Sequence, residues 1–417
     1  MKAHIYLKNC ILHHIGHPLH SKQIDMEVQD GIISQMGESI ISTATEIIEN
    51  AHISAGWFDM RVSFCDPGNE HKEDLISGAK AAAAGGFTGV ATLPNTVPVA
   101  DNKSQIEYQK NIQRGGQMLA TDIYPMGALS VGLLGKDMAE LYDMFQSGAI
   151  AFTDGDKAHT NSGLLMRCLQ YAKVFGAPIV VMANDEELSK GGKMHEGLVS
   201  VNLGLKGIPD IAETAQIQKC LEIVRYTEGK LHFSKVSTPQ GLQLIAAAKA
   251  EGLNVTADIS IQHLIHTDTA LESFDTHYKV MPPLRPQNYI DAMIKAINDG
   301  TIDCIVSDHK PENIENKAVE FDYAATGCIG TQTLYSAYQT YLADKISLNI
   351  FVKAVSNNPR NILNLPAIQI EQGAAANLTV FDPTEKWIYN KQNNLSKSYN
   401  TPFDNMEFTG KVLKVIK

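Results

Sequence analysis

The chain has 417 residues, of which 44% are apolar and only 19% are charged. This composition is typical of a soluble globular protein. Its 35 Lys and Arg against 46 Asp and Glu give a net charge of −11, which argues against partners such as nucleic acid or anionic lipid. No apolar run has the length of a signal peptide or of a membrane span, so we expect neither secretion nor membrane insertion.

The cysteines are isolated along the chain and form no CxxC pair; they are Cys10, Cys65, Cys168, Cys220, Cys304 and Cys328. Such spacing provides neither a disulfide framework nor a zinc knuckle. We expect reduced thiols in a cytoplasmic protein, most of them packed in the core as small apolar side chains.

The first 52 residues contain short apolar runs, such as His4–Leu7 and Ile32–Met36, and a turn at Asp30-Gly31. Short runs of this kind, bounded by turn residues, predict β-strands. The last residues of the chain contain similar runs, Asn377–Phe381 and Lys411–Ile416. We therefore predict that residues 1–52 and 346–417 form one small β-rich domain, with the polar, Asn-rich segment Lys386–Thr401 as a surface loop.

Residues 53–345 alternate between β-branched runs and amphipathic stretches. The predicted strands are Ile53–Phe64, Gly89–Leu93, Asp122–Ala128, Ala149–Asp154, Pro178–Ala183, Lys230–Ser237, Asn254–Ser260 and Thr301–Asp308. The predicted helices are His71–Gly85, Lys103–Arg114, Asp137–Gln146, Ser162–Phe175, Ile211–Glu228, Pro239–Glu251, Pro286–Asn298 and Thr331–Leu342. Eight strands alternating with helices predict an α/β protein with a (β/α)8 barrel.

Catalytic groups of such barrels lie at the C-terminal ends of the strands, and several motifs fall there in order. They are Asp66–Asp74, Leu93–Val99, His195–Gly197, Gly204–Pro209, Tyr278–Arg285 and Ser307–His309. Together they resemble the dihydroorotases of the amidohydrolase superfamily over nearly the whole chain. The resemblance implies a TIM-like amidohydrolase barrel with a small β-sandwich domain formed by the N- and C-terminal segments. It also implies a role in pyrimidine biosynthesis, where the family opens a cyclic amide.

The resemblance further implies one or two zinc ions, held by His-x-His on strand one, an acidic group on strand four, one His each on strands five and six, and Asp on strand eight. These positions hold Arg61, Ser63, Asp154, Met182, Lys235 and Asp308 in this chain. Zinc requires imidazole, thiolate or carboxylate donors, and guanidinium and ammonium groups have no lone pair to give. We expect no metal and no other cofactor, with Asp308 at the family's position for the general base.

The substrate-binding positions implied by the resemblance are also altered. Asn95 is retained, but Cys65 stands in place of an Arg that binds the substrate carboxylate, Met281 in place of an Asn, and Glu312 in place of a His. A thiol cannot replace the paired hydrogen bonds that Arg gives to a carboxylate.

The charges at the altered positions suggest what fills the space. Asp154 and Asp308 are expected to face each other across the barrel mouth, and a buried carboxylate without a partner is costly. Arg61 and Lys235 bring two positive charges to the same place. We predict that Arg61 contacts at least one of the two Asp side chains.

Two further groups of histidines have ordinary interpretations. His14, His17 and His20 recur every third residue in a Gly/Pro-containing stretch, which favours solvated turn residues over a metal site. His309 follows Asp308, and neighbouring strand residues point to opposite faces. We therefore expect His309 to pack outside the barrel.

Two functions remain open at this point. One is a dihydroorotase-like pseudoenzyme, present as a homodimer, that binds aspartate carbamoyltransferase and supports its assembly or regulation; inactive relatives with this role are part of what the resemblance implies. The other is an active hydrolase of dihydroorotate or of another cyclic amide with a rebuilt site. A third, a non-enzymatic dihydropyrimidinase-like protein, fits the motifs at Asp66–Asp74 and Met281–Arg285 less well.

Overall fold

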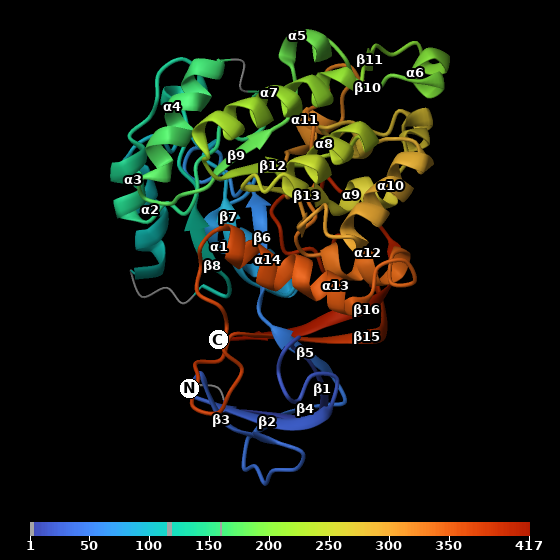
Figure 1. Ribbon diagram of the computed structural model, residues 1–417. Coiled ribbons are helices and arrows are strands. Elements are labelled where there is room, and N and C mark those ends of the chain that lie inside the picture. The colour runs from blue at the N-terminus through green and yellow to red at the C-terminus, as the bar shows by residue number, and fades with distance from the viewer. Residues whose placement is uncertain (1–3, 115–118, 159–160) are drawn as a thin grey trace.

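A barrel of alternating strands and helices occupies the middle of the chain in the computed structural model, which describes residues 4–114, 119–158 and 161–417 (Figure 1). Its strands are β6 (Trp57–Val62), β7 (Phe87–Thr92), β8 (Asp122–Pro125), β9 (Ile179–Met182), β12 (Leu231–Ser234), β13 (Val255–Ser260) and β14 (Cys304–Val306). The fourth strand position is reduced to Phe152, which bridges Gly127 on one side and Ile179 on the other. Val62 pairs with His309 and closes the ring.

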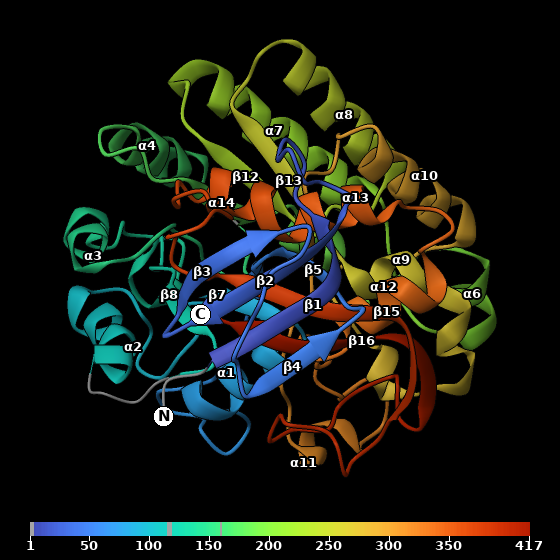
Figure 2. The ribbon, with the colours of Figure 1, turned by 90° about the horizontal axis from the view of Figure 1, so that it is seen from below.

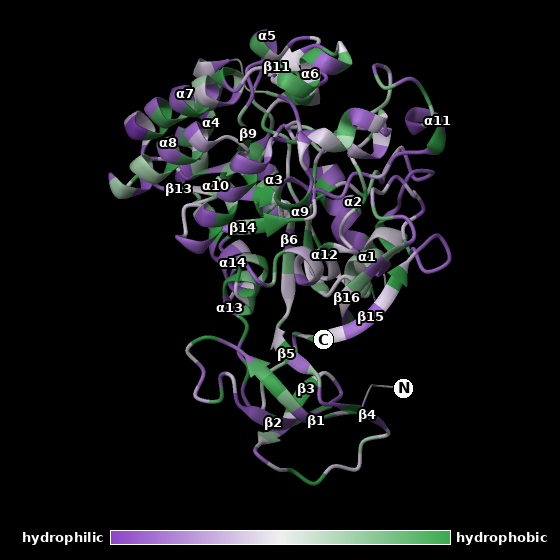
Figure 3. Cartoon of the chain, turned by 90° about the vertical axis from the view of Figure 1, so that its right-hand side faces the viewer, coloured by the Kyte–Doolittle hydropathy of each residue, from purple (hydrophilic) through white to green (hydrophobic). Residues whose placement is uncertain are grey.

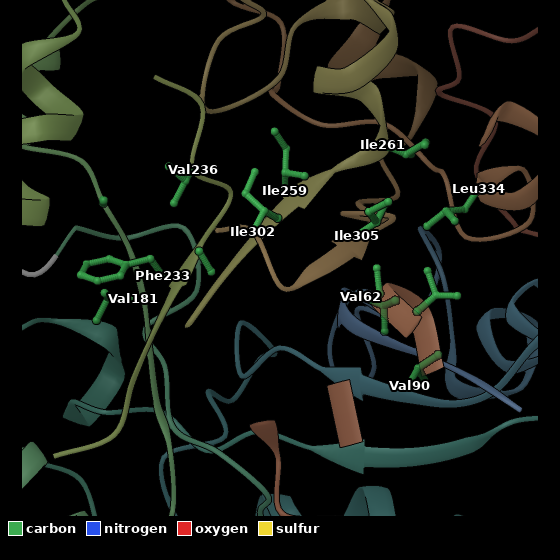
Figure 4. Packing of buried hydrophobic residues seen from close by; sticks show 14 of the residues in the cluster. Val62, Val90, Val181, Phe233, Val236, Ile259, Ile261, Ile302, Ile305 and Leu334 are labelled. Atoms are coloured by element: carbon green, nitrogen blue, oxygen red, sulfur yellow. The ribbon is translucent and has the colours of Figure 1, made fainter. Parts of the chain in front are cut away.

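The barrel strands are parallel and buried on both faces, which explains their continuous apolar and β-branched composition. Val62, Val90, Val181, Ile259 and Ile305 fill the core between strands and helices (Figure 4). The predicted barrel is therefore confirmed.

Helices surround the barrel, and Figure 3 shows them striped in purple and green, as expected for one apolar face on the strands and one polar face in water. They are α1 (Leu75–Ala84), α2 (Lys103–Arg114), α3 (Leu141–Ser147), α4 (Ser162–Lys173), α7 (Ile211–Thr227), α8 (Pro239–Ala250), α10 (Gln287–Asn298) and α12 (Leu334–Tyr341). Side-chain caps define several starts. Asp74 accepts hydrogen bonds from the backbone of Ile76 and Ser77 at the start of α1, and Thr238 caps α8 ahead of Pro239.

Shorter elements are inserted mostly after the barrel strands. They are η1 (Val131–Leu133), α5 (Glu186–Ser189), β10 (Met194–His195), α6 (Leu198–Leu203), β11 (Gly207–Ile208), α9 (Ile261–Ile265), η2 (Asp268–Ser273), η3 (Thr276–Tyr278) and α11 (Ile314–Lys317). The group from α5 to β11 lies at the top of Figure 1, at the C-terminal end of the barrel. These insertions surround the strand ends where the candidate site lies.

Strands from both chain ends form a second body at the opposite end of the barrel, as Figure 2 shows from below. They are β1 (His4–His13), β2 (Gln23–Gln29), β3 (Ile32–Gly37), β4 (Glu46–Glu49), β5 (His52–Ala55), β15 (Leu378–Tyr389) and β16 (Met406–Ile416). Within the described ranges they make one seven-stranded sheet in the order β16-β15-β5-β1-β2-β3, with β4 beside β1. Its core includes Ile5, Leu7, Leu12, Val380 and Ile416, so both chain ends contribute to one domain, as predicted.

Two segments differ from the sequence-based expectation. The helical stretch α13 (Leu348–Val352), η4 (Lys353–Asn357) and α14 (Asn358–Ile362) was assigned to the small domain, but it packs against β6 and β14 of the barrel. The segment Lys386–Thr401 is not simply a surface loop, because it begins inside β15 and because Ser396 and Ser398 are buried. Short apolar stretches at the end of a chain do not reveal which domain they cover.

The cysteines are unpaired, and all except Cys65, which is half-buried, lie in the core. The expectation of buried thiols is thus confirmed for most of them. None of the helices in the described part of the chain combines the length and apolar character that crossing a bilayer demands.

Candidate functional site

Five charged side chains meet at the C-terminal ends of the barrel strands. Arg61 lies on β6, Lys235 follows β12, Asp308 and Lys310 follow β14, and Asp156 follows the fourth strand position. We call these five residues the charge cluster. It occupies the place where enzymes built on such barrels carry their catalytic groups.

Arg61 is buried, with 2% of its side chain exposed. Its Nε donates to Asp308 Oδ1 at 2.9 Å, one terminal nitrogen donates to Asp156, and the other donates to Ser234 Oγ at 3.3 Å. Burial opposes the charged form of Arg61, but Asp156 and Asp308 outweigh it and raise its pKa. The prediction that Arg61 contacts one of the strand-end carboxylates is confirmed.

Lys235 is equally buried and uses all of its donors. Its Nζ donates to Asp156 Oδ1 at 2.9 Å, to Asp308 Oδ2 at 3.1 Å and to the Met281 carbonyl at 2.6 Å. An ammonium group has three N–H donors and no acceptor. Lys235 is therefore an ion-pair partner in this arrangement, and it has no lone pair for a metal.

Asp156 receives three cations. Besides Arg61 and Lys235, Lys310 donates to its Oδ2 at 2.8 Å. Burial alone would raise the pKa of Asp156, but Lys235, Lys310 and Arg61 together hold that pKa well below its ordinary range. The three cations therefore favour the ionised carboxylate.

Asp154 does not face Asp308, contrary to our expectation. Its Oδ1 accepts from the backbone N–H groups of Leu129 and Ser130 at 2.9 Å each, and its Oδ2 accepts from Ser130 Oγ. Gly155, with a φ of 67°, turns the chain immediately afterwards. Asp154 therefore fixes a neighbouring loop, and Asp156 enters the cluster instead.

A second layer of polar groups lies below the cluster. Asp258 on β13 accepts from the Lys235 backbone at 2.7 Å and lies 2.9 Å from His232 Nε2. Asp59 on β6 accepts from the backbone of Arg61 and of Ser307, and burial raises the pKa of Asp59 to about 7. These contacts hold the backbone at the strand ends and so fix the directions of Arg61 and Lys235.

The remaining family positions offer few donors to a metal. Ser63 Oγ lies 3.4 Å from Asn95 Oδ1, and Met182 is buried beside Met281 and Glu213. Among the residues that the structure describes, no group of three His, Cys, Asp or Glu side chains is placed to hold a metal ion. Zinc sites normally need at least three such donors from the protein, so the residues at these strand ends do not fit zinc.

The altered substrate positions also have partners of their own. Glu312 forms an ion pair with Lys72 at 2.8 Å and accepts from Asn316 Nδ2 at 2.8 Å. Burial raises the pKa of the Cys65 thiol to about 12, which keeps it neutral. Neither group offers a cation to an anionic substrate.

The histidines singled out from the sequence lie away from the cluster contacts. His309 is buried, and its Nε2 lies 3.4 Å from Glu73 Oε2, outside the barrel beside Phe64. His14, His17 and His20 belong to the turn between β1 and β2, where His20 Nδ1 accepts from the His14 backbone. Their interpretation as packing and turn residues agrees with these contacts.

Sequence reasoning missed Asp156 and Lys310. Both were visible as charged neighbours of chosen residues, in Asp154-Gly155-Asp156 and in Asp308-His309-Lys310. They would have been found by considering every charged residue near the expected strand ends, and not only the positions that the family uses as ligands.

The fold, a barrel with a small domain built from both chain ends, is shared with solved hydantoinases and dihydropyrimidinases. It matches the L-hydantoinase (dihydropyrimidinase) of Arthrobacter aurescens with a TM-score of 0.84 at 22% identity, over 100% of this chain and 94% of that one. The dihydropyrimidinase of Brevibacillus agri matches with a TM-score of 0.80 at 20% identity, over 99% and 94% of the two chains.

Sequence comparison gives the family more closely. The family model described as dihydro-orotase-like matches residues 52–240. The dihydroorotase of Syntrophotalea carbinolica is 37% identical over 95% of this chain and 93% of its own, and that of Ruminiclostridium cellulolyticum is 39% identical over 93% and 91%. The chain belongs to the dihydroorotase family.

Proposed function

We propose that this chain is a dihydroorotase homologue of pyrimidine biosynthesis that does not hydrolyse dihydroorotate and acts as a structural or regulatory partner. The observation that carries the proposal is the charge cluster. Two buried cations, Arg61 and Lys235, are bonded to Asp308 where the family resemblance places metal ligands and a general base.

The cluster provides little for ring opening. A general base needs a free oxygen to accept a proton in the transition state, and both oxygens of Asp308 already accept hydrogen bonds, from Arg61 and Lys235. A cyclic amide also needs its carbonyl polarised, but the N–H groups of Arg61 and Lys235 already donate to Asp156, Asp308, Ser234 and Met281. All three donors of Lys235 and three of the five of Arg61 are thus engaged, which leaves few donors to polarise a substrate carbonyl.

As the partner we propose aspartate carbamoyltransferase, bound by a homodimer of this chain. This part rests on the resemblance to inactive homologues that support the transferase. The surface around α6 is compatible with an interface, since Leu198 and Val201 lie three residues apart with 77% and 75% of each residue exposed. A specific interface would bury at least about 1,000 Å².

An active dihydroorotase with a rebuilt site is the second candidate. The relatives named above are called dihydroorotases at 37% and 39% identity, and that shared name favours this candidate more directly than it favours an inactive protein. The altered strand ends favour the first candidate, because function depends on the site rather than on the fold.

One experiment separates the two candidates. Purified protein is analysed for metal and assayed for ring opening of dihydroorotate and for closure of carbamoyl aspartate, with and without added zinc. We expect no stoichiometric zinc, no rise in melting temperature with zinc and no turnover, since a metal that binds the native state must stabilise it. Turnover of about 1 to 10³ per second would establish the second candidate.

Association with the transferase is tested by co-purification with the native aspartate carbamoyltransferase at micromolar concentrations. We expect a stable complex that a Leu198→Glu/Val201→Glu variant weakens if α6 lies in the interface. A second variant, Arg61→His/Ser63→His/Met182→His/Lys235→His, introduces the family's histidines and is tested for zinc binding. If no complex forms, the proposed partner is wrong, and if this variant also binds no zinc, the idea that the charge cluster replaced a zinc site is wrong as well.

A further inference from the structure

The carboxylate of Asp156 is held in an unusual way. Three cationic side chains from three different parts of the barrel converge on it: Arg61 and Lys235 on Oδ1, and Lys310 on Oδ2. Hydrogen bonds between charged groups are the strongest that side chains make. A carboxylate with both oxygens engaged in this way is bound as a small anionic ligand would be bound.

The donors and the acceptor differ in how they are fixed. Arg61 and Lys235 stand at barrel strand ends with 2% and 1% of their side chains exposed, whereas the side chain of Asp156 is 26% exposed. Asp156 lies beyond the strand position, after Gly155, whose φ is 67° and around which a Cβ would meet only open space. The cationic site is therefore part of the barrel, and its acceptor is supplied by a loop at the solvent boundary.

The charges show what would happen without that acceptor. The cluster holds three cations (Arg61, Lys235 and Lys310) against two carboxylates (Asp156 and Asp308), a balance of +1. Moving Asp156 away leaves three cations against one, a balance of +2 with two of the cations buried. Arg61 and Lys235 would keep Asp308 as a partner, but each would lose one ion pair and Lys310 would lose its carboxylate. Unbalanced buried charge is unfavourable, so the vacated position favours entry of another anion.

We infer that Arg61, Lys235 and Lys310 form a binding site for a small carboxylate ligand, and that Asp156 occupies this site as an internal carboxylate until such a ligand replaces it. Asp308 stays in place, bonded to Arg61 Nε and to Lys235. The site therefore accepts one carboxylate group, at the position that Asp156 occupies. The inference deepens the proposed function and rests on it, because zinc ligation and this convergence of cations exclude each other.

Competition between Asp156 and a ligand for the same cations predicts how substitutions change ligand affinity. A ligand that binds only when Asp156 has moved has its affinity reduced by the fraction of molecules in that state. Removing the Asp156 carboxylate therefore strengthens binding of the external anion. Removing Lys310, which is 23% exposed and donates to both Asp156 and Thr326, weakens it.

The test uses formate and acetate as probes, with sodium chloride at equal ionic strength as the reference. Binding is followed by the shift in melting temperature and by line broadening of ¹³C-formate in solution. We expect saturable formate binding to the natural protein, at least tenfold tighter binding to Asp156→Ala, and loss of most of that gain in Asp156→Ala/Lys310→Ala. Asp137→Ala, which removes an exposed carboxylate, should respond like the natural protein.

Several results would overturn the inference. They are a formate response of Asp156→Ala equal to that of Asp137→Ala, a response that chloride reproduces, and no saturable binding to the natural protein. Asp156→Asn preserves the shape of the side chain and is used in the same way if Asp156→Ala does not fold. None of these measurements depends on turnover. Failure to bind formate would overturn only this inference, whereas turnover in the hydrolysis assay would overturn the proposed function.

Discussion

Arg61 is the residue on which the cluster depends most, since it joins β6 to both Asp156 and Asp308. We predict that Arg61→Ala lowers the free energy of unfolding by about 3 kcal/mol, because removing one partner of a buried ion pair leaves uncompensated charge. Denaturant unfolding followed by circular dichroism measures the change.

Arg225 provides the matched control. It is an exposed arginine paired with Glu222 and Glu251, and surface pairs contribute little because solvent screens them. Arg225→Ala should therefore unfold at nearly the natural denaturant concentration. Equal effects of the two substitutions would show that the Arg61 contacts contribute no more than a surface pair.

His263 gives the protein a stability that depends on pH. Burial lowers its pKa to about 4, below the value near 6.5 of an unfolded histidine. Between these values the unfolded chain binds more protons, so the stability is complete above about pH 6.5 and is lost as the pH falls toward 4. His263→Gln should make the dependence of unfolding free energy on pH less steep in this window. It should not abolish it, because burial also lowers the pKa of His13, His195 and His266 to about 4. His71→Gln, at an exposed position, should leave the dependence unchanged.

The site shows which residue-scale features the sequence predicts. The pairing of Arg61 follows from charge alone, because a buried cation and a nearby carboxylate leave few other arrangements. The positions of Asp154 and Asp156 do not follow, because a two-residue difference is decided by the backbone turn at Gly155. Side chains alternate between the two faces only within a strand. Just beyond a strand end their direction depends on the local φ and ψ angles, which the sequence pattern does not give.

Among the elements, the segment between β14 and α12 is held in place by two buried lysines. Lys317 Nζ donates to the carbonyls of Thr276, Ala325 and Gly327 at 2.6, 2.9 and 3.1 Å. Lys279 Nζ donates to three further carbonyls, those of Phe321, Asp322 and Ala324. Each ammonium group thus satisfies several backbone acceptors, among them the carbonyls of Phe321, Ala324 and Ala325 within residues 312–327.

We predict that Lys317→Met loosens this segment. Methionine keeps the apolar stem but removes the donors, and each buried carbonyl left without a partner costs about 1–3 kcal/mol. Hydrogen–deuterium exchange should rise in residues 312–327 and stay constant in the barrel strands. Lys353→Met, at an exposed lysine, should leave exchange in the segment unchanged; a natural exchange pattern in Lys317→Met would contradict the prediction.

At this scale the sequence predicts most of the barrel, since each strand is a buried β-branched run and each outer helix an amphipathic stretch. It does not predict that the fourth strand shrinks to the bridge at Phe152, because pairing length depends on how neighbouring strands splay. It also misplaces residues 348–362, whose apolar side chains fit either domain until their contacts with β6 and β14 are known.

At the scale of the whole molecule, the core of the small domain and the core between barrel strands and helices both receive side chains from β15 and β16. Val380 on β15 packs in the core of the small domain, whereas Phe381, the next residue, packs with Trp57 and Tyr335 in the barrel core. Successive strand residues point to opposite faces, so β15 has one face in each core. The two domains are therefore mechanically joined along β15, and β16 also contributes to both cores through Phe408 and Ile416.

We predict that they unfold together. Leu12→Ala, in the small-domain core, should cost about 2–5 kcal/mol and should shift the transitions seen by circular dichroism and by tryptophan fluorescence by the same amount. Trp57 packs against Phe381 of β15, and Trp387 lies on β15 itself. Two separate transitions, with only one displaced by Leu12→Ala, would show that the cores are independent.

The pairing of β5 with β15 also determines when the small-domain sheet can be completed during synthesis of the chain. Ala55 lies opposite Leu378, and these positions are 378 − 55 = 323 residues apart. At roughly 5–20 residues per second, a ribosome needs about 16–65 s to make the intervening chain. Throughout that interval β5 can pair with β1, but its other edge lacks β15, so the small-domain sheet is completed only near the end of synthesis.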